Sequence, residues 1–196
     1  MARGPIEDIH GLTDLQRAML IRCASYPDQP LFMGQWWALL AGPLGEDGFA
    51  AAWAAVIQRH TVLRAGFHWE LKGDPAQVVV AAPSFAVERL DWSARADWRA
   101  ALDALLQEDR AQPFDLRRPP LMRVRLVRLA EEGAGPRHLL VWTRHHLAVD
   151  GWSLGEILDE VLTLYRGGAV PPALPFRRYV EWWQGRDAAA GRAHWD

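Results

Sequence analysis

Apolar positions recur at helical spacing in some stretches of the chain and alternate with polar positions in others. Helical spacing is found in five segments: 12–25, 44–60, 93–112, 153–166 and about 176–193. Thr13 or Asp14 can cap the first of these segments, and Ser93 stands at the start of the third. We therefore expect five helices, and Gly167 with Gly168 ends the fourth.

Strand patterns lie between these helices, in segments 29–42, 61–70, 76–81, 121–130 and 137–146. The turn sequence KGDP predicts a hairpin over 61–81, and EEGAGP joins the last two segments into a second hairpin. Helices and strands are mixed without a strict repeat. We therefore expect an α/β (α+β) fold, a two-layer sandwich in which helices pack on a mixed, mainly antiparallel sheet.

Length and composition narrow the class of protein. The 196 residues are enough for one sizeable core. A formal charge of −2 gives no strong attraction to nucleic acid or to an anionic membrane. The single cysteine, Cys23, cannot form an internal disulfide, and the N-terminus lacks the apolar run of a signal peptide. These features predict a soluble, cytoplasmic protein that binds neither nucleic acid nor membrane.

The stretch WTRHHLAVDGWSLGE, residues 142–156, carries the most chemistry. His145 and His146 stand at the end of an apolar strand, a place where a rigid scaffold meets an open loop. Successive strand residues point to opposite faces, so only one histidine of the pair faces a given cleft. This arrangement predicts a functional site at the end of the strand.

The residues after the histidines predict a turn into a helix. Gly151 allows the positive φ of a sharp turn, and Ser153 with Glu156 has the spacing of a capping box. The free N–H groups of this helix start then lie near His146, where they favour a developing negative charge. Asp150 needs a partner if it is buried, and an arginine is the expected one.

Three other interpretations of the histidine pair stay open. In these interpretations the pair is buried in the core with its hydrogen bonds made, or it is part of a metal site, or it is an exposed pair without a function. No cysteine, third histidine or carboxylate lies at metal-ligand spacing, so we expect no metal. The apolar strand before the pair and the helix start after it favour a functional site.

The motif HHLAVDGWS resembles the HHxxxDG signature of condensation domains of non-ribosomal peptide synthetases, whose superfamily includes chloramphenicol acetyltransferase. Four further segments resemble motifs of that family in order and spacing: LTDLQRAML, RHTVLRAGF, PFDLRRPPLMRVRLVRL and LPFRRYVEWW. Pro119 stands where glycine is more usual. The resemblance runs from about residue 10 to the end and implies a chloramphenicol-acetyltransferase-like lobe.

The resemblance also implies a domain organisation. Residues 1–10 are expected to be a lead or linker, 11–175 the N-terminal lobe of a condensation domain, and 176–196 the start of the inter-lobe helix. Motifs of a second lobe are missing, so we expect a truncated chain that is inactive as an isolated lobe.

The family's chemistry, carried over by position, is peptide-bond formation between substrates held as thioesters on phosphopantetheine arms. Domains of this family have two similar lobes that face each other across a tunnel. The resemblance implies His146 as the active-site histidine and His145 as a supporting residue facing away from that tunnel. Gly151 would help to hold the oxyanion, and Asp150 would pair with Arg64 or Arg59. No cofactor is bound by the domain itself. The implied partners are upstream and downstream peptidyl carrier proteins, the second lobe and an adjacent adenylation domain.

Two alternatives and one finer assignment accompany this hypothesis. One alternative is a non-catalytic lobe that docks a carrier protein or tailoring enzyme. The other is an acyltransferase that uses acyl-CoA. The stretches FHWELKGDPAQVV and VWTRHHLAVDGWSL resemble the subclass that takes a D-configured donor. Some relatives have a further histidine directly before the pair, where this chain has Arg144.

Overall fold

A four-stranded sheet forms the centre of the molecule in the computed structural model, which describes residues 4–70, 73–131 and 135–186. Its strand order is β2-β7-β6-β5. The bounds are Met33–Ala41 for β2, Glu88–Trp92 for β5, Met122–Leu129 for β6 and Arg137–His145 for β7. The pairs β2–β7 and β6–β7 are antiparallel, and β5 pairs with β6 in parallel. The sheet is therefore mixed and mainly antiparallel, as expected.

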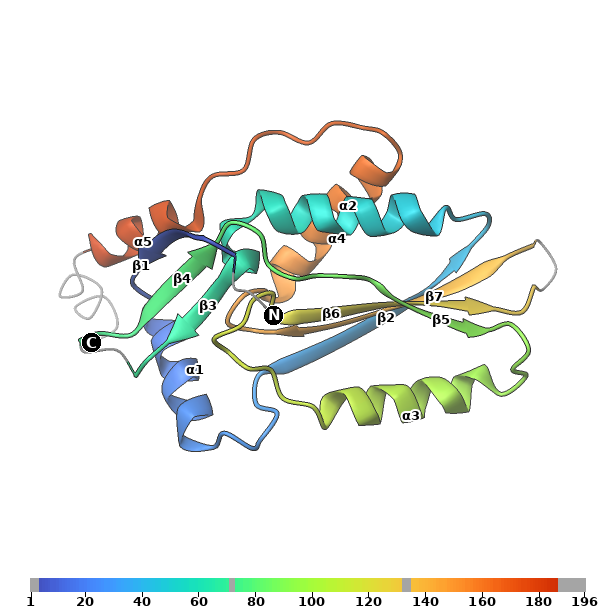
Figure 1. Ribbon diagram of the computed structural model, residues 1–196, viewed down its shortest axis with the longest axis horizontal. Coiled ribbons are helices and arrows are strands. Elements are labelled where there is room, and N and C mark those ends of the chain that lie inside the picture. Colours follow the sequence, from blue (N-terminus) through green and yellow to red (C-terminus); the bar gives the residue numbers. More distant parts are fainter. Residues whose placement is uncertain (1–3, 71–72, 132–134, 187–196) are drawn as a thin grey trace, which may run out of the picture.

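A second, three-stranded sheet lies beside the first, at the left of Figure 1. Its order is β1-β4-β3, with bounds Ile6–His10, Ala76–Val80 and Ala65–His68 in that order. Both of its pairs are antiparallel, and β3 with β4 is the hairpin that the turn at 72–75 predicted. Every pair in the two sheets except β5–β6 is antiparallel.

Helices cover both faces of the four-stranded sheet (Figure 1). The five α-helices of the described residues are α1 (Asp14–Ser25), α2 (Glu46–Arg59), α3 (Trp98–Arg110), α4 (Gly151–Tyr165) and α5 (Phe176–Gln184). The largest core cluster joins α2 and α4 to one face, where Trp53 packs edge-to-face against Trp142 of β7. Trp98 and Leu102 of α3 pack against Val127 and Leu139 on the other face. The expected fold class is confirmed.

Several element boundaries differ from the sequence-based prediction. Residues 6–10, expected to be a lead or linker, form β1, and β5 was not expected at all. The predicted strand over 61–70 begins as a 3-10 helix at Thr61–Arg64 and becomes β3 only at Ala65. The predicted helix over 93–112 begins at Trp98, after an Asp97 that makes no side-chain cap bond. Short strands at a sheet edge carry too few residues for a clear period.

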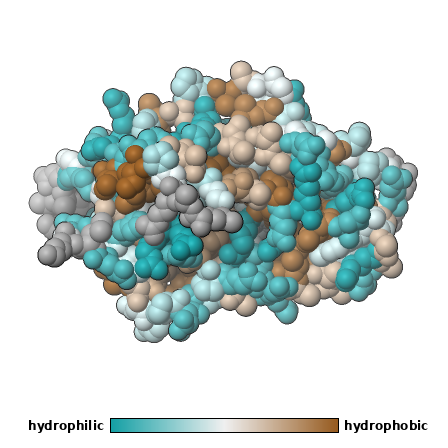
Figure 2. All heavy atoms as spheres, in the orientation of Figure 1, coloured by the Kyte–Doolittle hydropathy of each residue, from teal (hydrophilic) through white to brown (hydrophobic). Residues whose placement is uncertain are grey.

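Apolar side chains are also found on the surface. Figure 2 shows such residues gathered over β1 and β4. Ile6 and Ile9 of β1 are 62% and 52% exposed, and a cleft of about 690 Å³ lies between this strand and the segment 117–124. The small sheet therefore buries one face less completely than the large sheet does.

A buried carboxylate ties α3 to the large sheet. The side chain of Asp109 is fully buried, and it accepts hydrogen bonds from the Thr143 hydroxyl and from Arg123 Nε at 2.7 Å. Arg125 pairs with the same carboxylate. Burial alone raises the pKa of Asp109, but the hydroxyl and the two guanidinium groups outweigh it and hold that pKa below its usual range.

We expect Asp109→Ala to lower the free energy of unfolding by about 3 kcal/mol, because it removes the carboxylate partner of Arg123 and leaves Arg125 with Glu88 alone. Urea denaturation at pH 7 measures the change. Asp103→Ala, at an exposed position of the same helix, is the control and should cost less than about 0.5 kcal/mol. Equal effects of the two substitutions would contradict this account.

Candidate active site

The candidate site lies where β7 ends and the chain turns into α4. His145 is the last residue of β7, and its N–H donates to the carbonyl of Leu121 at 2.9 Å. The N–H of His146 donates to the carbonyl of Phe32 at 2.9 Å. The next turn closes back on the strand, because Ala148 and Val149 both donate to the His145 carbonyl, at 3.1 and 3.2 Å. The backbone that carries both histidines is therefore held on two sides.

His145 is almost fully buried, and both of its ring nitrogens face protein atoms. Its side chain belongs to a residue only 2% exposed. Nδ1 accepts a hydrogen bond from the N–H of Leu147 at 3.1 Å, so the proton of the neutral ring is on Nε2, which lies 3.7 Å from Cys23 Sγ. Burial, with the charge of His146, lowers the pKa of His145 to about 4. His145 is therefore a neutral donor near pH 7 and has no free lone pair to act as a base.

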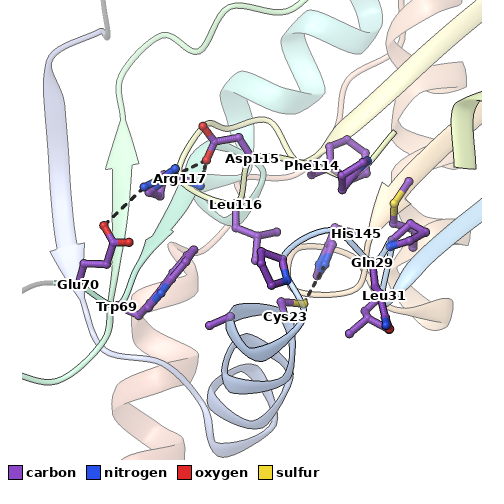
Figure 3. Close-up of a pocket in the computed structure, with 15 residues that line it drawn as sticks. Cys23, Gln29, Leu31, Trp69, Glu70, Phe114, Asp115, Leu116, Arg117 and His145 are labelled. Carbon is purple, nitrogen blue, oxygen red and sulfur yellow. Dashed lines mark hydrogen bonds and ion pairs between the residues drawn. The ribbon is translucent and has the colours of Figure 1, made fainter. Parts of the chain in front are cut away.

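A cleft of about 610 Å³ opens beside His145 (Figure 3). It lies between α1, the segment before β2 and the segment 113–117, and Cys23 contributes from the helix. Phe114 and Phe32 make edge-to-face contacts with the His145 ring. Arg117 closes one side, where it pairs with Asp115 and Glu70. His146 does not line this cleft, so the two histidines face different surroundings, as strand alternation predicted.

His146 lies in the turn directly after β7 and is partly exposed. Its two neighbours in sequence, His145 and Leu147, are each 2% exposed. Exposure alternates through this turn, since Ala148 is also partly exposed and Asp150 is exposed. An imidazole here can meet a ligand, whereas the ring of His145 meets only the protein interior and the cleft of Figure 3.

Asp150 caps α4. Its Oδ1 accepts a hydrogen bond from the N–H of Ser153 at 2.8 Å, and the extended backbone of Asp150 is typical of an N-cap. This bond lowers the pKa of the carboxyl group below its usual range. The prediction that Ser153 caps this helix was wrong, since the chain already turns at Asp150. Gly151 is the first helical residue and is not among the residues with positive φ, so the predicted reason for this glycine was also wrong.

The arginines expected beside Asp150 lie elsewhere. Arg64 is 3% exposed and pairs with Glu7 at 2.6 Å, while its Nη1 also donates to the carbonyl of Val80. Arg59 pairs with Glu160 at 3.1 Å. Arg64 thus joins α2 to the small sheet and Arg59 joins α2 to α4, so their assignment as partners of Asp150 was wrong. Sequence distance could not show which carboxylate each arginine reaches.

Arg144 is the arginine whose charge interacts with Asp150. It is 7% exposed, and its Nε and Nη1 are buried without a hydrogen-bond partner among the described residues. Its guanidinium stacks close to Gly34 of β2, where an added Cβ would come within 3.3 Å of Cζ. Burial lowers the pKa of Arg144, and the charge of Asp150 opposes that shift only in part. Gly34 lies opposite Arg144 in the β2–β7 register, which the sequence alone does not show.

Sequence reasoning also missed a buried pair of amides behind residues 146–150, the turn between β7 and α4, which we call the histidine loop. Gln16 of α1 donates from Nε2 to the carbonyl of Leu147 at 3.0 Å. Its Oε1 accepts from the N–H of Thr13 at 3.1 Å and from Gln77 Nε2 at 3.2 Å. Gln77 in turn donates to the carbonyl of Gly11 at 2.9 Å. The capping-box spacing of Thr13 and Gln16 was the readable signal, but it pointed only to a helix start.

Metal ligands do not cluster in the part of the chain that the structure describes. Residues 4–70, 73–131 and 135–186 contain no group of three or more His, Cys, Asp or Glu side chains arranged to hold a metal ion. In the same ranges, none of the helices has the length and apolar character needed to cross a bilayer.

Comparison with known proteins gives one family. A family model described as "Condensation domain" matches residues 6–196. A linear gramicidin synthase chain of Brevibacillus parabrevis is 38% identical over 200 residues, which cover 98% of this chain and 2% of that protein. Bacitracin synthase 3 of Bacillus licheniformis is 31% identical over 197 residues, which cover 97% of this chain and 3% of that protein. The family match starts at residue 6, so it includes β1.

Solved structures show the same fold. The starter condensation domain of rhizomide synthetase RzmA superposes with a TM-score of 0.79 at 24% identity, covering 96% of this chain and 48% of that one. A mutant of the same domain, solved in complex with C8-CoA and Leu-SNAC, gives a TM-score of 0.80 at 23% identity, covering 95% of this chain and 43% of that one. The chain therefore spans about half the length of the solved domains and a small part of the two synthases.

Burial of a neutral His145 makes stability depend on pH. The pKa of His145 is about 4 in the folded protein against 6.5 for a free histidine, so its contribution is present above pH 6.5 and is lost as the pH falls through 4. The full effect is about 3 kcal/mol. We expect the loss of unfolding free energy between pH 7 and pH 4.5 to be smaller in His145→Asn, which keeps an acceptor for Leu147 N–H, than in the wild type. Urea denaturation at both pH values tests this, and equal pH dependence would contradict it.

Two nitrogens of the Arg144 guanidinium are buried without a hydrogen-bond partner among the described residues, and this should cost more stability than the contact of Arg144 Cζ with the Trp142 ring, at 5.4 Å, contributes. We expect Arg144→Met to raise the free energy of unfolding by about 1 kcal/mol or more, because an apolar side chain of similar length removes a buried charge. Arg166→Met, at an exposed position, is the control and should change little. A clear destabilisation by Arg144→Met in the same denaturation experiment would show that the guanidinium has a stabilising partner.

Proposed function

This chain belongs to the condensation-domain family, and from that premise we propose that it supplies the histidine loop for amide-bond formation in non-ribosomal peptide synthesis. The acceptor amine attacks the carbonyl of a donor thioester, a C–N bond forms and the thiol leaves. Both substrates arrive on phosphopantetheine arms of carrier proteins. The domain itself binds no cofactor in this proposal.

The contrast between the two histidines is the observation that carries the proposal. His145 is almost fully buried, neutral and bonded through Nδ1, so it supports the loop. His146 is partly exposed, and its backbone N–H is fixed by the Phe32 carbonyl. A rigid backbone with one reachable imidazole is what positioning of a substrate requires.

The chemistry asks two things of His146. An α-amine has a pKa of about 7.7–8.0, so an appreciable fraction is already neutral near pH 7 and needs orientation more than deprotonation. After the C–N bond forms, the nitrogen of the tetrahedral adduct becomes strongly acidic. A neutral imidazole at about 3 Å can orient the amine and then take that proton, which contributes about 10²–10⁴-fold. In this proposal His146 mainly positions the acceptor amine and secondarily accepts its proton.

The start of α4 supplies the electrostatic part. The first N–H groups of a helix have no partner within it and carry partial positive charge. Asp150 accepts from Ser153 and leaves Gly151 as the first helical residue, two positions before that bond. In our proposal the Gly151 N–H faces the oxyanion of the tetrahedral adduct. Asp150 shapes the turn as a helix cap and acts on Arg144 through charge.

The proposal extends to partners and to the remainder of the domain. Because the chain spans about half of the solved condensation domains, we propose that it is the N-terminal lobe and that a second lobe completes the tunnel. Upstream and downstream carrier proteins present the substrates, and an adenylation domain loads the acceptor carrier. A D-configured donor residue is the proposed subclass. The isolated lobe is inactive in this scheme.

An acyl-CoA donor is the second candidate. It is favoured by the C8-CoA and Leu-SNAC complex of the rhizomide synthetase domain, a structure of the same fold. The experiment that separates the two offers octanoyl-CoA and a carrier-bound aminoacyl thioester to the complete domain in parallel. A lobe that only docks a carrier protein would turn over neither donor.

We expect His146→Ala, in the complete domain with both carriers loaded, to lower the rate of amide formation by about 10²–10⁴-fold. Single-turnover assays, with the product followed by mass spectrometry, measure it. The matched variant His60→Ala changes a histidine that pairs with Glu160 outside the loop, and it should keep most of the activity if the fold is intact. Near-normal product formation by His146→Ala would overturn the proposed role.

A further inference from the structure

We propose that Gln16 is a positioning residue for His146. It acts by holding the Leu147–Ala148 peptide, one residue beyond the histidine, through the hydrogen bond from Nε2 to the carbonyl of Leu147 at 3.0 Å. The inference rests on the proposed function only for its effect on the rate. The geometric part, that α1 fixes the histidine loop through one amide, stands on the structure alone.

The orientation of the Gln16 amide is set by its partners. A backbone N–H only donates and a backbone carbonyl only accepts. Because Oε1 faces the Thr13 N–H and Nε2 faces the Leu147 carbonyl, exchanging the two atoms would break both bonds. The donor to the histidine loop is therefore the amide NH₂ group.

The capping box by itself does not require glutamine. In a capping box the residue at the third helical position accepts from the cap N–H, and glutamate serves as well as glutamine. Only glutamine can also donate to a carbonyl on its far side. The bond to Leu147 is thus a second task of Gln16, which the start of α1 does not explain.

The loop is held from the opposite direction as well. The carbonyl that receives the His146 N–H belongs to Phe32, whose φ of 52° lies in the left-handed region that few non-glycine residues adopt. The carbonyl of Phe32 accepts from the N–H of His146, and the Gln16 amide donates to the carbonyl of Leu147. Two consecutive residues are therefore held by two segments that are distant in sequence. This restricts the position of the backbone that carries the His146 ring.

The network is buried. Gln16 is 5% exposed, Gln77 is fully buried and Leu147 is 2% exposed. Water cannot replace the lost donor without entering this interior, so removing the donor leaves the Leu147 carbonyl without its partner. The Leu147–Ala148 peptide then keeps only the bond from the Ala148 N–H to the His145 carbonyl, and we expect His146, one residue earlier, to shift with the loosened turn. A displacement of about 1 Å at a catalytic group costs about 10²-fold in rate.

The test compares Gln16→Glu with Gln77→Glu in the 196-residue chain. Each change buries one extra carboxylate in the same amide pair, but only Gln16→Glu removes the donor to the histidine loop, since Gln77 donates to the Gly11 carbonyl. The readouts are the ring resonances of His146 by NMR and the hydrogen exchange of the Ala148 and Val149 amides. We expect Gln16→Glu to shift the ring signals and to speed exchange at least about 10-fold relative to Gln77→Glu.

A second pair of variants keeps the test valid if a glutamate variant fails to fold. If either glutamate variant does not fold, Gln16→Met and Gln77→Met remove the same donors without adding a charge. Equal His146 shifts and equal exchange in the two members of a pair would overturn the inference, whatever their stability.

The activity arm separates this inference from the proposed function. In the complete domain, Gln16→Glu should lower kcat about 10²-fold with KM changed by less than about 3-fold, and Gln77→Glu should not. If His146→Ala has no effect on amide formation while the NMR difference is present, the proposed function fails and the positioning stands. If His146→Ala abolishes activity and Gln16→Glu leaves kcat unchanged, the positioning role is overturned.

Discussion

The burial of β7 on both faces is the constraint from which the rest of this structure follows. Eight of the nine residues of this strand are buried, and it has antiparallel partners on both sides, β2 and β6. Trp142 packs against α2 on one face, and Thr143 binds Asp109 of α3 on the other. A strand held in this way cannot slip, because a shift of one residue would exchange its two faces. Its end is therefore a rigid place from which to present a side chain.

The two histidines acquire different properties from that single position. His145 continues the alternation of the strand and is buried where Thr143 is buried, one side chain further along. Desolvation then keeps it neutral, and the Leu147 N–H fixes its tautomer. His146 is the first residue beyond the ladder, and its side chain is partly exposed. Two identical side chains, adjacent in sequence, thus become a buried donor and a partly exposed imidazole.

The charged groups around the site do not pair with one another as the sequence suggested. Asp150 uses its hydrogen bonds at the start of α4, and the two arginines expected beside it hold other junctions of the fold. Arg144 remains under the loop with two buried nitrogens that no described residue satisfies. The buried Arg144 guanidinium and the buried neutral ring of His145 therefore both lie within two residues of His146.

Local patterns in the sequence determined the helices, the two hairpins, the mainly antiparallel sheet and the position of the histidine pair at a strand end. Each of these depends on periods of a few residues or on a turn read within one segment. Tertiary structure alone decided that β1 and β5 join the sheets, that Arg64 meets Glu7 in place of Asp150, and that Gln16 reaches Leu147 across 131 positions. These partners are chosen by packing between distant segments, and a pattern within one segment contains no information about what will face it.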